Sequence, residues 1–143
     1  MDALFDQSAL TSLAERLVKA ARAAGADACD AVAMRSVSQS VEVRDGAVEE
    51  SQRSEGNDMG LRVLVGKRQA VVSTNDMATD GIAALAERAV AMAKVAPEDP
   101  YAGLADASQL AKSWPDLDLV DKDLPDTAAL EQMAQRAEAA GRA

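Results

Sequence analysis

The residues with the clearest potential for chemistry are four aspartates in the run PDLDLVDKD at 115–123, namely Asp116, Asp118, Asp121 and Asp123. Carboxylate oxygens are the ligands that hard cations prefer, and a calcium loop places several of them around a glycine turn. In this run two leucines and a valine interrupt the acids, and there is no glycine. The pattern therefore favours a solvated segment held by its leucines over a calcium site.

Histidine, the usual general base near neutral pH and the commonest zinc ligand, is absent from the 143 residues. This excludes a Ser-His-Asp triad or a Cys-His catalytic pair, and one cysteine without histidine cannot form a Cys/His structural zinc site. The single cysteine, Cys29, lies between Asp27 and Asp30 in an apolar-leaning segment, and we interpret it as a packing residue. No catalytic, cofactor-binding or metal-binding residue is assigned to this chain.

The pair Gly66-Lys67 is the nearest approach to a phosphate-binding loop. A P-loop needs an earlier glycine and a Ser or Thr directly after the lysine, and it opens a helix. Here Arg68 follows the lysine, and alternating apolar residues on both sides predict strands. The pair is therefore interpreted as a hairpin turn.

The charge balance limits the class of partner. The chain has 24 acidic and 15 basic residues, a net charge of −9, and residues 97–143 hold ten of the acids against four bases. This balance opposes general nucleic-acid binding and contact with an anionic membrane. With one cysteine, no leader and no apolar run near the ~20 residues that span a bilayer, we expect a cytoplasmic protein.

Two hydrophobic periodicities predict the elements that must position these residues. Apolar residues at helical spacing predict a helix over 8–24, ended by Gly25. Alternation then predicts about five short strands joined by tight turns, one of them at Asp45-Gly46. The strands are expected at 28–35, 37–44, 47–54, 60–65 and 69–74, with a further turn at 54–58.

Helical patterns return after the strands, over 79–96 and 126–140. The irregular stretch 97–124 between them is expected to be anchored by Tyr101, Leu104, Trp114 and Leu117, although Tyr101 and Trp114 could instead bind a partner. The order of elements predicts an α+β fold, an antiparallel β-meander of about five strands with helices packed on one face. Residues 1–96 form the expected domain core. Residues 97–143 are expected to form an irregular acidic connector and a terminal helix that lead into a C-terminal domain absent here. We therefore expect a fragment of a longer protein.

An ordered set of segments resembles the N-terminal domain of the TldD/PmbA family, and it covers nearly the whole chain. The segments are GADA at 25–28, DGAVEE at 45–50, GLRVLVGKRQA at 60–70, STND at 73–76, APEDPYAGLA at 96–105 and WPDLDL at 114–119. The last two are more similar to the PmbA type (also called TldE) than to TldD. The resemblance implies a longer parent protein.

The resemblance also implies a function, namely a non-catalytic domain in a subunit of a heterodimeric zinc metallopeptidase that processes unfolded peptides. Family members of the TldD type carry an H-E-x-x-x-H zinc signature in their C-terminal part, so zinc is expected in a TldD-like partner subunit and no cofactor in this chain. Peptides are the expected substrates, and DNA gyrase an indirect partner at most. Two alternatives stay open, a module that binds gyrase or another protein without proteolysis and a domain that only helps its parent fold.

Overall fold

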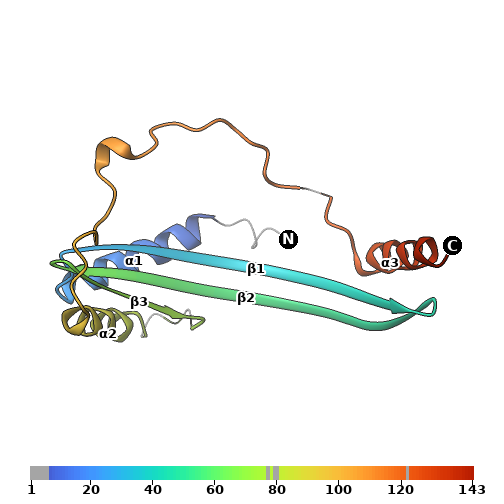
Figure 1. Ribbon diagram of the computed structural model, residues 1–143, viewed down its shortest axis with the longest axis horizontal. Helices are drawn as coiled ribbons and strands as arrows, with labels where there is room; N and C mark the ends of the chain where they lie inside the picture. Colours follow the sequence, from blue (N-terminus) through green and yellow to red (C-terminus); the bar gives the residue numbers. More distant parts are fainter. Residues whose placement is uncertain (1–6, 77, 79–80, 122) are drawn as a thin grey trace. The chain divides into compact units, whose positions relative to one another are not determined.

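The computed structural model describes residues 7–76, 78, 81–121 and 123–143, and Figure 1 shows the order of its elements. They are helix α1 (Gln7–Ala23), strands β1 (Ala28–Arg44), β2 (Ala47–Val65) and β3 (Arg68–Thr74), helix α2 (Gly81–Val95), the short 3-10 helix η2 (Ala107–Gln109) and helix α3 (Thr127–Arg142). The strands form one sheet in the order β1-β2-β3. Strands β2 and β3 pair antiparallel, and a two-residue turn joins β1 to β2, which requires the same orientation. The predicted α+β class is confirmed.

The described residues form three strands, and the prediction of about five was wrong. The strands expected at 28–35 and 37–44 are both part of β1, and the turn expected at 54–58 lies inside β2. The side chain of Arg35 donates from Nε to Asn57 Oδ1 at 2.9 Å, and a Cβ on Gly56 would lie 2.8 Å from Ser36 Oγ. Gly56 and Asn57 are residue types that favour turns, yet here they continue the strand because they contact β1. Glycine lacks a Cβ and so lets β1 approach closely.

The chain divides into two compact units. The first comprises the residues up to Ser36 together with Gly56–Leu110, and the second comprises Val37–Glu55 and Ala111–Ala143. Strands β1 and β2 contribute residues to both units, and each unit is described by itself below. The division into 1–96 and 97–143 stays a prediction.

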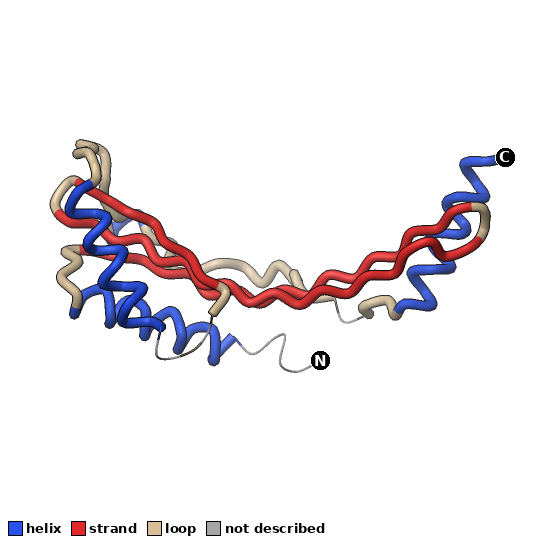
Figure 2. The backbone as a smooth tube through the Cα atoms, turned by 90° about the horizontal axis from the view of Figure 1, so that it is seen from below, coloured by secondary structure: helices blue, strands red, loops and turns tan. Residues whose placement is uncertain are grey.

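The core of the first unit lies between the sheet and helices α1 and α2, which cover one face of the strands (Figure 2). Alternate residues of β2 point into it, and Leu61 lies opposite Val72 in the register of β2 and β3. Helix α2 buries the apolar stripe expected from the sequence, so that prediction is confirmed. The core comprises Leu13, Leu17, Ala21, Cys29, Met59, Leu61, Val63, Val72, Ile82, Leu85, Ala86, Ala89, Val90 and Ala93.

The helices begin and end close to their predicted bounds. Gly25 follows α1 with a φ of 101°, as expected for the residue that ends a helix. Helix α2 is described from Gly81, and the predicted start at Thr79 lies outside the described residues. Among the helices described, none combines the length and the apolar character needed to cross a bilayer.

The turn at Asp45-Gly46 is confirmed. Asp45 has a φ of 53° and Gly46 a φ of 79°, so both central residues are left-handed, which is the pattern of a type I′ hairpin turn. This turn twists in the same sense as the strands it joins, and it therefore sets the register of the hairpin in the second unit.

Replacing Gly46 with valine is expected to lower the free energy of unfolding of the hairpin by about 1–3 kcal/mol, because a β-branched side chain is strained at positive φ. The matched control is Gly103→Val, since Gly103 has no positive φ and an added Cβ meets nothing within 4 Å. Hydrogen exchange of the amides of residues 41–50 measures the effect. Equal exchange in the two variants would contradict the strain at this turn.

Candidate functional site

The four aspartates of the 115–123 run do not gather around a common point. The side chains of Asp116 and Asp121 accept hydrogen bonds from the backbone N–H of Asp118 (3.0 Å) and Asp123 (2.9 Å), so each closes a local turn. Over the described ranges, no group of three or more carboxylate, thiol or imidazole side chains is close enough to hold a metal ion. These aspartates lie on an exposed segment, and the structure does not bring them together.

Cys29 is buried in the core of the first unit, where its thiol lies 3.7 Å from the carbonyl oxygen of Val18. The neighbouring carboxylates are engaged elsewhere. Asp27 accepts from the backbone N–H of Gly66 at 2.7 Å, and Asp30 forms an ion pair with Arg62. Hydrogen bonding to Asp30, assisted by its charge, raises the pKa of Arg62 above its usual value. The cysteine is positioned as a packing residue.

The turn at Gly66-Lys67 joins β2 to β3, and Lys67 and Arg68 contact the segment that follows α2. Lys67 accepts from the backbone N–H of Asp99 (2.8 Å) through its carbonyl and donates from Nζ to the carbonyl of Ala102 (3.2 Å). The guanidinium of Arg68 donates to the carbonyl of Lys94 and contacts Glu98. This is the predicted hairpin turn, and it attaches residues 98–102 to the end of the sheet.

The predicted anchors of the irregular stretch were wrong. Tyr101 is 94% exposed, Trp114 79% and Leu117 63%, and Leu104 is also exposed. Within residues 97–110 the buried residue is Ala102. The side chain of Asp99 accepts from the backbone N–H of Tyr101 and closes a turn there, and the carbonyl of Ala102 accepts from Lys67. Side-chain size suggested the aromatic anchors, whereas backbone hydrogen bonds and a small residue make the attachment.

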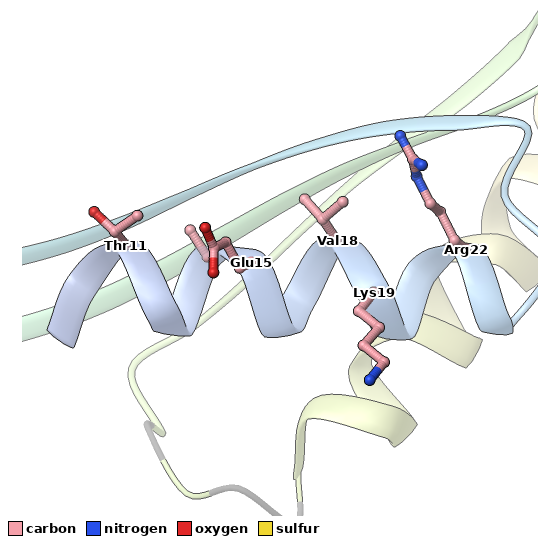
Figure 3. A pocket seen from close by; sticks show the side chains of 6 residues that line it. Thr11, Glu15, Val18, Lys19 and Arg22 are labelled. Carbon is pink, nitrogen blue, oxygen red and sulfur yellow. The ribbon is translucent and has the colours of Figure 1, made fainter. Parts of the chain in front are cut away.

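A shallow hollow of about 420 Å³ runs along α1, lined by Thr11, Ala14, Glu15, Val18, Lys19 and Arg22. Figure 3 shows Glu15 and Arg22 on the side of the helix that carries Val18, whereas Lys19 points away. The charged groups therefore do not converge on one point, and the hollow has no arrangement suited to catalysis.

In the second unit, helix α3 is attached to the tip of the hairpin by polar contacts. The carboxylate of Glu138 accepts from the backbone N–H groups of Asp45 and Gly46, both at 2.8 Å. Arg142 contacts Asp45 and Glu138, and the hydrogen bond to Asp45 is the main cause that raises the pKa of Arg142. The left-handed turn points two N–H groups in one direction, which makes it a receptor for an anion.

Sequence reasoning missed an exposed apolar surface on the sheet of the first unit. Val32 and Met34 of β1 and Val71 of β3 are exposed, and they alternate with residues that face the core. The available signal was apolar residues at consecutive positions, Ala31 to Met34 and Val71-Val72, since a strand with one solvated face normally alternates.

Comparison with known proteins gives a consistent result. Residues 29–93 match the model of the PmbA/TldA metallopeptidase domain 1. "Metalloprotease PmbA" of Escherichia coli O157:H7 is 32% identical over 93 residues, which are 65% of this chain and 21% of that protein. A crystal structure of a "putative modulator of DNA gyrase" from Bacteroides thetaiotaomicron has the same fold, with a TM-score of 0.68 and 22% identity over 73% of this chain and 24% of that one. The chain thus spans about a fifth of the curated relative's length.

Proposed function

Because residues 29–93 belong to the first domain of the PmbA/TldD family, we propose that this chain is the non-catalytic N-terminal part of a PmbA-type subunit. That subunit pairs with a TldD-like subunit in a cytoplasmic zinc metallopeptidase complex acting on unfolded peptides. The observation that carries the proposal is the family match over the sheet and α2, in a chain without histidine. The catalytic zinc is assigned to the partner subunit.

The donor groups in the described part of this chain do not fit a catalytic zinc. Such a site takes three protein ligands from histidine, cysteine or carboxylate side chains and keeps one position open. Here the one thiol is buried against Val18, and the aspartates of the 115–123 run are exposed, with Asp116 and Asp121 each closing a local turn. No step of peptide hydrolysis is therefore assigned to residues of this chain.

The sheet offers a means of holding an extended peptide. In the order β1-β2-β3, the outer strands β1 and β3 each have one neighbour within the described sheet. An extended peptide can add to an outer strand through main-chain hydrogen bonds. These bonds require an extended conformation but do not depend on the side chains of the peptide. Exposed Val71 on β3 and Val32 on β1 supply apolar contacts beside these strands. This arrangement supports a role in guiding unfolded substrates.

We expect the chain alone to hydrolyse no peptide and to retain no stoichiometric zinc, because it has no histidine and only one cysteine to hold a zinc ion that would activate a water molecule. The measurement combines metal content after gentle purification with cleavage of an unstructured peptide, with and without added zinc. Activity should appear when the intact PmbA-type subunit is mixed with its TldD-like partner. Chelator-sensitive turnover by the chain alone would refute the proposal.

A binding role without proteolysis is the second candidate. It is favoured by the exposed aromatic side chains Tyr101 and Trp114, which are not part of the core. Titration of this chain into purified DNA gyrase separates the candidates, since saturable binding together with an inactive reconstituted complex would favour the second.

A further inference from the structure

Helix α3 is held on the tip of the hairpin by one carboxylate that faces two backbone donors. The two oxygens of Glu138 accept from the backbone N–H groups of Asp45 and Gly46, each at 2.8 Å. Both turn residues have a left-handed backbone, which directs their N–H groups toward the same carboxylate. A further polar contact, from the side chain of Gln39 to Thr127 Oγ1, lies at the start of the helix. The helix and the hairpin are therefore joined by polar groups at both ends of α3.

A guanidinium from the next turn of the helix adds to the contact at the tip. Arg142 lies 2.5 Å from a carboxylate oxygen of Asp45 and 2.8 Å from one of Glu138. Glu138 precedes Arg142 by four residues, which is the order and spacing at which such a pair also stabilises a helix. Gln135 donates from Nε2 to the carbonyl of Gly46 at 3.4 Å, a longer and weaker hydrogen bond. Charged groups therefore make most of the attachment.

Apolar packing contributes little to the attachment of α3. Leu130 and Ala134 lie on the same face of the helix as Glu138 and are half-buried, and no described side chain of the second unit is buried. The first unit differs, because α1 and α2 bury their apolar residues in a core. Residues 111–121 and 123–126, which precede α3, contain no helix or strand. A helix held by a few polar contacts and joined by such a segment separates from its support at low free-energy cost.

We propose that α3 is a reversible latch on the hairpin, closed by the Glu138 carboxylate on the N–H groups of Asp45 and Gly46. Arg142 strengthens the closed state through its ion pairs with Asp45 and Glu138. Salt opens the latch, because ions in solution screen the attraction between these groups. Opening returns the two N–H groups of the tip to water while the first unit keeps its fold. The latch stands independently of the function proposed above, since all of its groups belong to this chain.

Hydrogen exchange of the backbone amides of Asp45 and Gly46, followed by NMR in the full chain, measures how much of the protein is closed. Glu138→Gln is expected to speed the exchange of both amides about tenfold, because a neutral amide oxygen replaces a carboxylate that accepted two charge-assisted hydrogen bonds. Exchange in the wild type should accelerate between about 0.05 M and about 1 M salt. The variant should respond less to salt, since it lacks the charge that salt screens.

The matched control is Glu131→Gln, the same change on the same helix at a carboxylate that accepts from Gln135. It should leave exchange at the tip within about twofold of the wild type. Asp45→Asn keeps a residue that tolerates the left-handed turn and removes the carboxylate that faces Arg142. Asp45→Asn and Arg142→Gln should each speed exchange about threefold, and their combination should add little, because both remove one ion pair. The amides of residues 61–65 in the first unit are the internal reference.

Faster exchange at the tip alone, with the reference amides unchanged, is the result that supports the latch. Equal exchange in Glu138→Gln and Glu131→Gln would overturn it. Tip amides that exchange in the wild type as fast as in an unstructured peptide would also overturn it, since α3 would then not be attached. Protection that rises with protein concentration would place Glu138 on the tip of a second copy and refute a latch within one chain.

Discussion

Leu61→Ala should lower the free energy of unfolding of the first unit by about 2–5 kcal/mol, the range found when a fully buried leucine is truncated. Leu61 has no exposed surface, lies opposite Val72 in the part of β2 that pairs with β3, and belongs to the core of the first unit. The loss combines the transfer free energy of the removed atoms with the cost of the cavity left behind. Urea denaturation followed by circular dichroism measures it.

The matched control is Leu119→Ala, which removes the same atoms from a side chain that is 84% exposed. Its effect on stability should stay within about 0.5 kcal/mol, as for other surface substitutions. If both variants unfold at the same urea concentration, Leu61 does not occupy the core described here.

Ala89→Asp should destabilise the first unit by about 3–5 kcal/mol, enough to unfold a marginally stable domain at neutral pH. Ala89 is fully buried between α2 and the rest of the core, and no buried polar or charged side chain occurs in the described part of the chain. The introduced carboxylate would therefore have no cation or hydrogen-bond donor to compensate for its lost hydration.

The pH dependence of this variant has a definite sign. Burial raises the pKa of the introduced carboxyl in the folded state above its unfolded value of about 3.9. The destabilisation is therefore greatest above the folded-state pKa, and it shrinks as the pH falls and the carboxyl becomes protonated. Ala84→Asp on the exposed face of the same helix is the control and should show neither effect. A pH-independent loss in Ala89→Asp would point to altered packing instead of a buried charge.

The elements predicted well from sequence are those in which local preference and tertiary burial agree. Helix α2 is the clearest case, since the stripe from Ile82 to Ala93 is both periodic and buried. The turn at Asp45-Gly46 is another, because its backbone geometry requires these residue types. The turn predicted at 54–58 was wrong because local preference and tertiary contacts disagree there. Gly56 and Asn57 favour turns, but their contacts with β1 keep them in the strand.

Surface features were harder to predict, because the sequence does not show which apolar side chains are buried in the core and which stay exposed. Trp114 and Tyr101 were expected to anchor the irregular stretch because they are large, yet both are exposed and the small side chain of Ala102 is buried instead. The contact between Glu138 and the hairpin tip joins residues more than ninety positions apart. The turn itself was predicted, but no local sequence pattern indicates that Glu138 contacts it. A glutamate on a helix that faces only solvent has the same local sequence pattern.

The attachment of α3 has a thermodynamic consequence. None of the described side chains in the second unit is buried, and α3 is held there by carboxylate, amide and guanidinium groups. The heat capacity increase of unfolding comes from exposing apolar surface, whereas exposing polar surface lowers it. Apolar side chains of the second unit such as Leu130 and Ala134 are only half-buried, so release of α3 is expected to leave a small step in a calorimetric baseline. Across the whole chain the increase per residue falls below the usual ~12–15 cal/mol/K, because about a third of the residues contribute little to it.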